Sequence, residues 1–192
     1  YLGEVIEKTT YDQIYDEHTF LFSAHSVKYL FDQYGMELIN LEPQATHGGS
    51  MRYIIAHTGD YNVKNSVKKH IQYEKKLGIN NYHILRKFKK RVQQNKSDFR
   101  KLLVKLNSQN KSVVGYAATS KSTTVLNYFN IETDLIKYIS DTTPIKINKF
   151  SPGKHIKIKS HNFFKNNYPD YAILFAWNHH KEIIKKLSFV KK

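Results

Sequence analysis

The chain contains no cysteine, and this absence limits both its framework and its metal chemistry. Without thiols, these residues can form neither a disulfide framework nor a thiolate zinc site. They also lack an apolar run long enough to span a membrane and a visible signal-peptide pattern. We therefore expect a cytoplasmic protein with no membrane partner and no metal ligands among these residues.

Acidic residues are scarce, since 16 Asp and Glu stand against 31 Lys and Arg, for a net charge of +15. Such a charge attracts polyanions, so a basic nucleic-acid-binding protein has to be considered. The lysines are spread along the whole length, however, and no zinc finger, RNA-binding aromatic signature or basic-helix dimer pattern is present. The basic run at residues 87–91 is typical of the wet side of an amphipathic helix. We interpret the charge as mostly solvated surface and expect no nucleic-acid partner.

The first half of the sequence predicts a helix and two strands, followed by more helix. Aromatic residues at 14% and hydrophobic residues at 40% indicate a folded chain, and 192 residues allow one good core or a small domain plus part of another. Ser23 is a good N-cap and Gly35 a natural stop for a helix between them. Strands are expected at residues 36–41 and 51–57, and residues 60–107 are expected to be mostly helical. Helix, strand, turn, strand is the order in which a class I methyltransferase domain ends, with an antiparallel edge.

A strand, a small polar loop and a helix N-terminus are predicted between residues 113 and 128. The strand covers residues 113–117, the turn residues 118–121, and the helix starts at Ser122. Backbone N–H groups, the helix dipole and Lys121 make such a loop suitable for a phosphate. A second strand is expected at residues 135–139, closed by Asp141, where a dinucleotide fold places the acid that binds a ribose.

The glycine fingerprint of a dinucleotide site is incomplete in this loop. Gly115 is present, but Ala117 and Ser120 stand where the second and third glycines belong. An NAD site is therefore disfavoured against a Rossmann-like fold with another ligand. A strand–helix unit that binds nothing remains open.

The C-terminal stretch predicts further strand–helix pairs and hence a parallel sheet. A strand is expected at residues 155–158, a helix at 161–167, a strand at 171–175 and a helix at 179–187. Because loops at the carboxyl ends of parallel strands bind ligands, Trp177 and Asn178 are candidates at one loop and Ser120 and Lys121 at another.

Residues 11–20 crowd a phenol, carboxylates and an imidazole together. A carboxylate beside an imidazole orients it and raises its basicity, and a phenol can donate a hydrogen bond to a developing oxyanion. The phenol of Tyr15, the carboxylates of Asp16 and Glu17 and the imidazole of His18 are therefore candidate catalytic groups. A solvated loop before a helix is the alternative interpretation.

Several motifs together resemble the sugar C-methyltransferases that methylate C3 of a nucleotide-linked 4-keto-6-deoxysugar. That family carries a Tyr-His-Glu-His block followed by an aromatic-Ser pair, and this chain has Asp16 in place of the first histidine. Its loop glycines are replaced by Ala117 and Ser122. The matching segments, in chain order, are residues 15–18, 22–23, 47–52, 115–118 with Lys121 and 127–128, 152–156 and 176–178.

The resemblance implies an α/β fold in three parts and covers only the back half of the family's length. Residues 1–60 would be the C-terminal part of the S-adenosylmethionine methyltransferase domain, with a helix and antiparallel edge strands. Residues 61–108 would be a helical connector, and residues 109–192 a Rossmann-like sugar-nucleotide-binding domain with a parallel sheet. The S-adenosylmethionine site and a zinc domain would precede Tyr1, so we expect the chain alone to be inactive.

The resemblance also implies roles for individual residues. His18 would take the C3 proton, assisted by Tyr15 and Glu17, and the resulting enolate would attack the methyl donor. The substrate, a nucleotide-linked sugar, would contact polar groups of both halves, namely His47, Ser50, Arg52, Thr119, Ser120, Lys121, Asn127, Trp177 and Asn178. A Rossmann-like module that binds a nucleotide or sugar nucleotide without chemistry is the second-ranked alternative, and the nucleic-acid binder the third.

Overall fold

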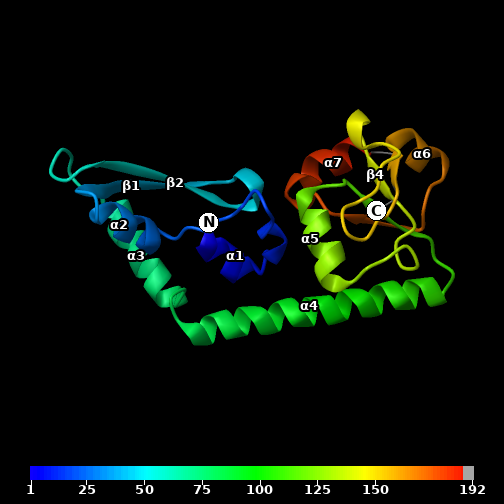
Figure 1. Cartoon of the computed structure of the whole chain (residues 1–192), viewed down its shortest axis with the longest axis horizontal. Coiled ribbons are helices and arrows are strands. Elements are labelled where there is room, and N and C mark those ends of the chain that lie inside the picture. The colour runs from blue at the N-terminus through cyan, green and yellow to red at the C-terminus, as the bar shows by residue number, and fades with distance from the viewer. Residues whose placement is uncertain (188–192) are drawn as a thin grey trace. The chain divides into compact units, whose positions relative to one another are not determined.

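The computed structural model describes residues 1–187, which form two compact units (Figure 1). The N-terminal unit comprises residues 1–11 and 16–93. The C-terminal unit comprises residues 12–15 and continues from residue 94. Residues 188–192 of the expected C-terminal domain lie outside the described residues.

The N-terminal unit is built on an antiparallel hairpin of β1 (Met36–Gln44) and β2 (Ser50–His57), joined through η2 (Thr46–Gly48). The helices α2 (Ala24–Asp32) and α3 (Asn65–Leu77) pack on the hairpin. The core of this unit is aliphatic, and its residues come from the hairpin, α2 and α3. The two helices each face the strands with an apolar stripe. The buried core residues are Ala24, Val27, Leu38, Leu41 and Val67.

Local sequence sets the ends of these helices. The Ser23 side chain accepts from the Ser26 N–H and the Ser26 hydroxyl accepts from the Ser23 N–H, so a reciprocal capping box starts α2. The helix α1 (Leu2–Lys8) ends at Thr9. At the end of α3, Gly78 has φ 70°, a left-handed conformation that glycine adopts without a Cβ clash, and its N–H donates to two carbonyls of the last turn.

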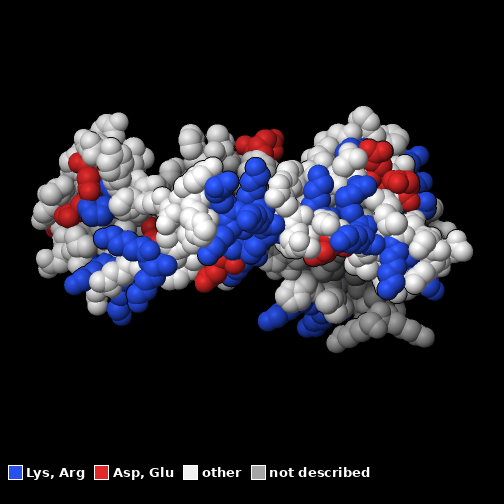
Figure 2. Space-filling model, turned by 90° about the horizontal axis from the view of Figure 1, so that it is seen from below, with Lys and Arg blue, Asp and Glu red and all other residues white. Residues whose placement is uncertain are grey.

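The long helix α4 (Tyr82–Ser108) begins in the N-terminal unit and ends in the C-terminal one. Lys87, Lys89 and Lys90 on it are exposed, as expected for the wet side of an amphipathic helix. Figure 2 shows Lys and Arg side chains in several groups separated by uncharged residues. The described surface therefore shows no sign of a single concentrated basic stripe on this face.

The C-terminal unit contains a parallel sheet in the order β5-β4-β3-β6. Parallel pairing requires crossover connections between strands. The helices α5 (Ser120–Phe129) and α6 (His161–Asn166) lie in two of the connections between successive strands, and the 3-10 helix η3 (Pro144–Lys146) lies in the one between β4 and β5. The strands are β3 (Val113–Tyr116), β4 (Ile139–Asp141), β5 (Ile158–Ser160) and β6 (Tyr171–Leu174). The α/β fold class, with an antiparallel hairpin and a parallel sheet, is thus confirmed.

Helices cover the parallel sheet. Tyr116 and Val114 of β3 pack with Phe164 of α6 (His161–Asn166) and Leu187, which follows α7 (His180–Lys186). Elsewhere in the unit, Phe129 of α5 (Ser120–Phe129) contacts Phe99 of α4, with ring centroids 6.0 Å apart. Leu103 of α4 and Leu126 of α5 are fully buried.

Several boundaries differ from the sequence prediction, and three of them have a clear physical reason. The second parallel strand was expected at residues 135–139 but covers Ile139–Asp141, because residues 133–135 form a turn. The strand expected at residues 155–158 is wrong as well, since His155 has φ 49° and β5 starts at Ile158. Finally, α5 starts at Ser120 because Thr119, with Ser122, forms its capping box.

Candidate functional site

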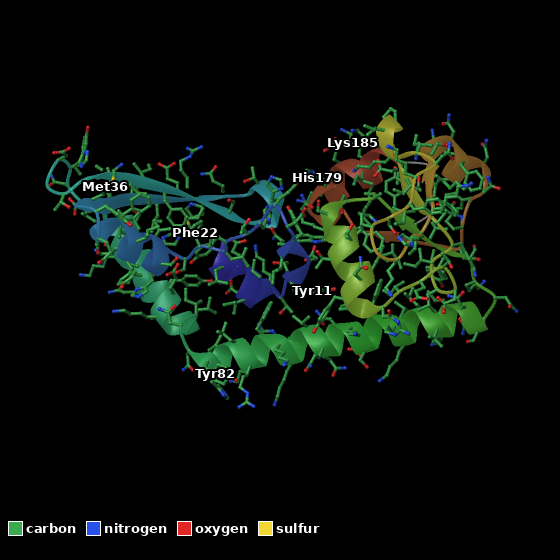
Figure 3. The ribbon with its side chains drawn as sticks, in the orientation of Figure 1. Tyr11, Phe22, Met36, Tyr82, His179 and Lys185 are labelled. Atoms are coloured by element: carbon green, nitrogen blue, oxygen red, sulfur yellow. The ribbon has the colours of Figure 1, made fainter. Side chains whose placement is uncertain are left out.

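The C-terminal unit has a topological switch point between β3 and β6. After β3 the chain continues to β4, which pairs with one edge of β3, whereas β6 pairs with the other edge of β3. Loops leaving the carboxyl ends of such strands diverge and leave a crevice where ligands bind in open α/β sheets. The loop after β3 leads into α5, and the loop after β6 leads into η4 (Trp177–His179), whose last residue is labelled in Figure 3.

The predicted residues Lys121 and Asn178 meet at this switch point. The Lys121 Nζ donates to the Asn178 Oδ1 at 2.9 Å and lies 5.3 Å from the centroid of the Trp177 ring. Only 6% of Lys121 is exposed. Burial lowers the pKa of Lys121, and the charge of Asp12 partly opposes this shift.

Asp12 completes this buried cluster. The Trp177 Nε1–H donates to the Asp12 Oδ2 at 2.6 Å, and only 7% of Asp12 is exposed. Burial raises the pKa of Asp12, while the Trp177 hydrogen bond and the Lys121 charge act in the opposite direction. The cluster thus links an amide, a cation, an indole and a carboxylate through the contacts of Lys121 with Asn178 and Trp177 and of Trp177 with Asp12.

Thr119 and Ser120 face a different space, a pocket of about 400 Å³. Opposite them lie Lys146, Lys149 and Phe150 from the connection between β4 and β5. The Lys146 Nζ donates to the Ala118 carbonyl at 2.8 Å and so braces the loop. Hydroxyls, lysines and the first turn of α5 make this pocket suitable for an anion. The predicted loop residues therefore lie in two environments: Thr119 and Ser120 line this pocket, whereas Lys121 belongs to the buried cluster with Trp177.

Asp141, the acid at the position that binds a ribose in dinucleotide folds, forms hydrogen bonds within the protein instead. The two Asp141 oxygens accept from the backbone N–H groups of Ala118 and Thr143, each at 2.7 Å. Asp141 is buried and has Lys146 at 3.9 Å. The carboxylate therefore fixes the loops after β3 and β4 to each other.

Asn127 lies beyond the first turn of α5 and does not line the pocket of Thr119 and Ser120. Its Nδ2 donates to the Thr123 carbonyl at 2.8 Å and to the Pro152 carbonyl at 3.0 Å. A Cβ on Gly153 would lie 2.0 Å from the Asn127 Oδ1, so the turn at Pro152 approaches α5 closely. In the structure, Asn127 fastens that turn to the helix.

In the N-terminal unit, the predicted His18 and His47 lie near each other. Their ring centroids are 6.4 Å apart and the rings are edge-on, at 89°. His47 is in η2 with φ 54°, where the chain turns sharply between β1 and β2. The arrangement places two imidazoles at one end of the hairpin.

The other predicted residues of the N-terminal unit are more dispersed. Glu17 is exposed, and Ser50 pairs with Gln44 at the start of β2. The Arg52 Nη1 lies 3.1 Å from the Glu42 Oε2, a cross-strand ion pair on an exposed face. Tyr15 belongs to the C-terminal unit, so the candidate catalytic block begins in one unit and ends in the other.

Comparison with known proteins identifies the family. The model for the C-methyltransferase C-terminal domain matches residues 45–192. The chain belongs to the C-methyltransferase family. It is also 31% identical over 185 residues to the C-methyltransferase NovU of Streptomyces niveus, covering 96% of this chain and 44% of NovU. The chain thus spans under half the length of this relative.

In this chain, sequence reasoning missed Asp12, Lys146 and Lys149. Asp12 lies in the crowded block of residues 11–20, but nothing local distinguishes it from the exposed Asp16. Its partner Trp177 is 165 residues away. Lys146 and Lys149 are two of many basic residues, and only the fold brings them to the pocket of Thr119 and Ser120.

Neither a membrane span nor a metal cluster is found in the described part of the chain. No helix within residues 1–187 is both long and apolar enough to cross a bilayer. The same residues contain no group of three or more His, Asp or Glu side chains arranged to hold a metal ion. A second pocket, of about 550 Å³ beside Glu74 and Tyr82, contains none of the predicted site residues.

Proposed function

We propose that the chain is the C-terminal portion of an S-adenosylmethionine-dependent C-methyltransferase that acts on a nucleotide-linked keto-deoxysugar. The family match over residues 45–192 carries the proposal, because it gives the reaction type. The motifs at residues 15–18 and 47–52 support the sugar substrate, since they resemble those of the sugar C-methyltransferases.

His18 is the proposed base. A C3–H bond beside a C4 ketone is acidic enough for an imidazole if the enolate oxygen is stabilised. His18 takes the proton, and the C–H electron pair moves into the enolate, leaving negative charge on the C4 oxygen. The Tyr15 phenol donates to that oxygen, and Glu17 orients the imidazole. His47, whose ring is edge-on to that of His18, is proposed to contact the sugar.

The N-terminal unit has no fitting site for the methyl donor among its described residues. S-adenosylmethionine supplies an electrophilic methyl group, to which the substrate carbon forms its new bond. The strands of the N-terminal unit form only an antiparallel hairpin, whereas a donor site of this class uses a strand, a glycine-rich turn and a helix in parallel arrangement. We therefore assign the acceptor side of the reaction to this chain and expect it to be inactive alone.

The pocket of Thr119 and Ser120 is proposed to hold the phosphates of the nucleotide. Lys146 and Lys149 line it together with the first turn of α5, so positive charge and N–H donors converge there. The phosphates would thereby anchor the substrate far from the reacting carbon, and the binding energy would serve to orient the sugar.

The test is exchange of the C3 proton for deuterium in heavy water, without the methyl donor. The protein expressed from its complete gene is incubated with a nucleotide-linked 4-keto-6-deoxysugar. We expect His18→Gln to slow the exchange by about 100-fold or more, because general-base catalysis contributes that much. His83→Gln, on exposed α4, is the matched control and should exchange like the wild type. Unchanged exchange in His18→Gln would remove His18 from the role.

The alternatives give different results in the same experiment. A binding module without chemistry would hold the sugar nucleotide but exchange no proton in the wild type. A nucleic-acid-binding protein would instead bind DNA or RNA with an affinity that falls steeply with salt.

A further inference from the structure

Residues 12–15 are held by the C-terminal unit although they lie near the start of the chain. Asp12 and Gln13 are both buried. The Thr124 Oγ1 of α5 donates to the Ile14 carbonyl at 3.1 Å. The Trp177 Nε1–H donates to the Asp12 Oδ2 at 2.6 Å. The segment is thus fastened to two separate elements, the helix after β3 and the turn after β6.

Lys121 and Asn178 help to hold Trp177, the residue that binds Asp12, in place. The Lys121 Nζ donates to Asn178, the neighbour of Trp177, and lies 5.3 Å from the centroid of the indole ring. Lys121 and Asp12 also attract each other through their charges. The polar groups of all four side chains are directed at one another, although the loop position of three of them had predicted substrate contacts.

The anchored segment leads directly to a proposed catalytic group. Tyr15 is three residues after Asp12, and three residues of chain span about 10 Å at most. Fixing Asp12 and Ile14 therefore restricts where the Tyr15 backbone can lie. A hydrogen bond to an enolate oxygen is sensitive to displacements of about 0.5 Å, so such a restriction affects the rate.

We propose that Trp177 is a positioning residue, which together with Lys121 and Asn178 anchors Asp12 so that Tyr15 is held for proton removal. The role of Tyr15 rests on the proposed function, whereas the anchoring does not. Burying a cation and a carboxylate near each other is an inefficient source of stability, because each ion loses its hydration. The cluster is better explained by the geometry that it imposes on residues 12–15.

The anchor itself is tested by fluorescence, which is independent of any activity. Trp177 is the one tryptophan of the chain, so its emission reports its contact with Asp12. Because the pKa of Asp12 is raised, we expect an emission change at a pH above the ordinary aspartate range, and Asp12→Asn should remove this step. The His180 Nδ1 lies 2.8 Å from the Trp177 carbonyl, and His179 is adjacent, but both rings are present in the wild type and in Asp12→Asn, so comparing the two proteins cancels their effect on the emission. Identical titrations of the wild type and Asp12→Asn would overturn the anchor.

The positioning role is tested by the kinetics of proton exchange. Trp177→Phe keeps a ring but loses the Nε1–H donor, and we expect kcat for exchange to fall about 10-fold or more with KM within about 3-fold. Asp12→Asn keeps an acceptor oxygen for Trp177 and should lose less. Tyr171→Phe, exposed on β6, is the control and should change neither parameter. A rise in KM with kcat unchanged would instead make Trp177 a substrate contact and overturn the positioning role.

The two experiments separate the two claims. If the wild type exchanges no proton, the proposed function fails and the positioning role fails with it. The pH titration of Trp177 emission still decides whether residues 12–15 are anchored.

Discussion

Replacing Ala117 with glycine tests how the sequence shapes the loop after β3. Ala117 has φ 72°, a left-handed conformation that costs a residue with a Cβ about 1–2 kcal/mol. The resemblance to sugar C-methyltransferases places a glycine at this position. The N–H of residue 117 donates to the Ser140 carbonyl at 2.8 Å, and glycine would keep that bond.

The neighbouring alanine provides a matched comparison. Among residues 1–187, positive φ occurs at Ala117 but not at Ala118, and both side chains are partly buried. Glycine costs about 0.4–1 kcal/mol through the entropy of the unfolded chain at either position, and the loss of a partly buried methyl costs about 0.4 kcal/mol at either. Only Ala117→Gly recovers the strain. We therefore expect Ala117→Gly to be more stable than Ala118→Gly by about 1–2 kcal/mol.

Denaturant unfolding followed by tryptophan emission measures this difference. The one tryptophan lies in the C-terminal unit, so the signal reports the unit that contains both alanines. Unfolding of the wild type and of both variants should show the same denaturant dependence, so that midpoints compare directly. If Ala117→Gly is no more stable than Ala118→Gly, the left-handed conformation at residue 117 is not strained and the reasoning fails.

Two further substitutions test the packing of each unit by thermal unfolding. Buried Glu74 accepts hydrogen bonds from the Tyr1 hydroxyl and from the first two N–H groups of α2. Glu74→Gln replaces one acceptor oxygen with a donor, so it should lower the free energy of unfolding by about 1–3 kcal/mol. Exposed Glu7→Gln is its control and should lose under about 0.5 kcal/mol; equal losses would contradict the buried cap. A Cβ on Gly115 would lie 2.8 Å from the Phe175 Cε2, so Gly115→Ala should lose about 1–3 kcal/mol through overpacking, and an unchanged melting temperature would show that the sheet yields there.

The hairpin and its helices could be predicted because their signals are local. The Ser23 cap, the stop at Gly35 and the apolar stripes of α2 and α3 each lie within a few residues of the feature that they determine. The parallel strands were harder to locate. They are only three or four residues long, so no periodicity marks where residues 135–141 change from turn to strand.

The candidate site was likewise predictable only in part. Loop position alone placed Lys121 and Asn178 after the carboxyl ends of two different parallel strands. The structure shows that these strands are neighbours and that the two side chains are in contact. Loop position could not predict that Lys121 lies against Trp177 whereas Thr119 lines the pocket with Lys146. Side chains one or two residues apart at the start of a helix point in different directions. The long-range partnership of Asp12 and Trp177 depends on the path of the whole chain.

The most direct measurement follows an isotopically labelled methyl group from S-adenosylmethionine to a nucleotide-linked 4-keto-6-deoxysugar, using the protein expressed from its complete gene. Carbon NMR of the product identifies the atom that receives the label. The account predicts one labelled methyl bonded to the sugar carbon beside the ketone, and a much lower yield with His18→Gln. A label on oxygen or nitrogen, or no transfer to any such sugar, would contradict it.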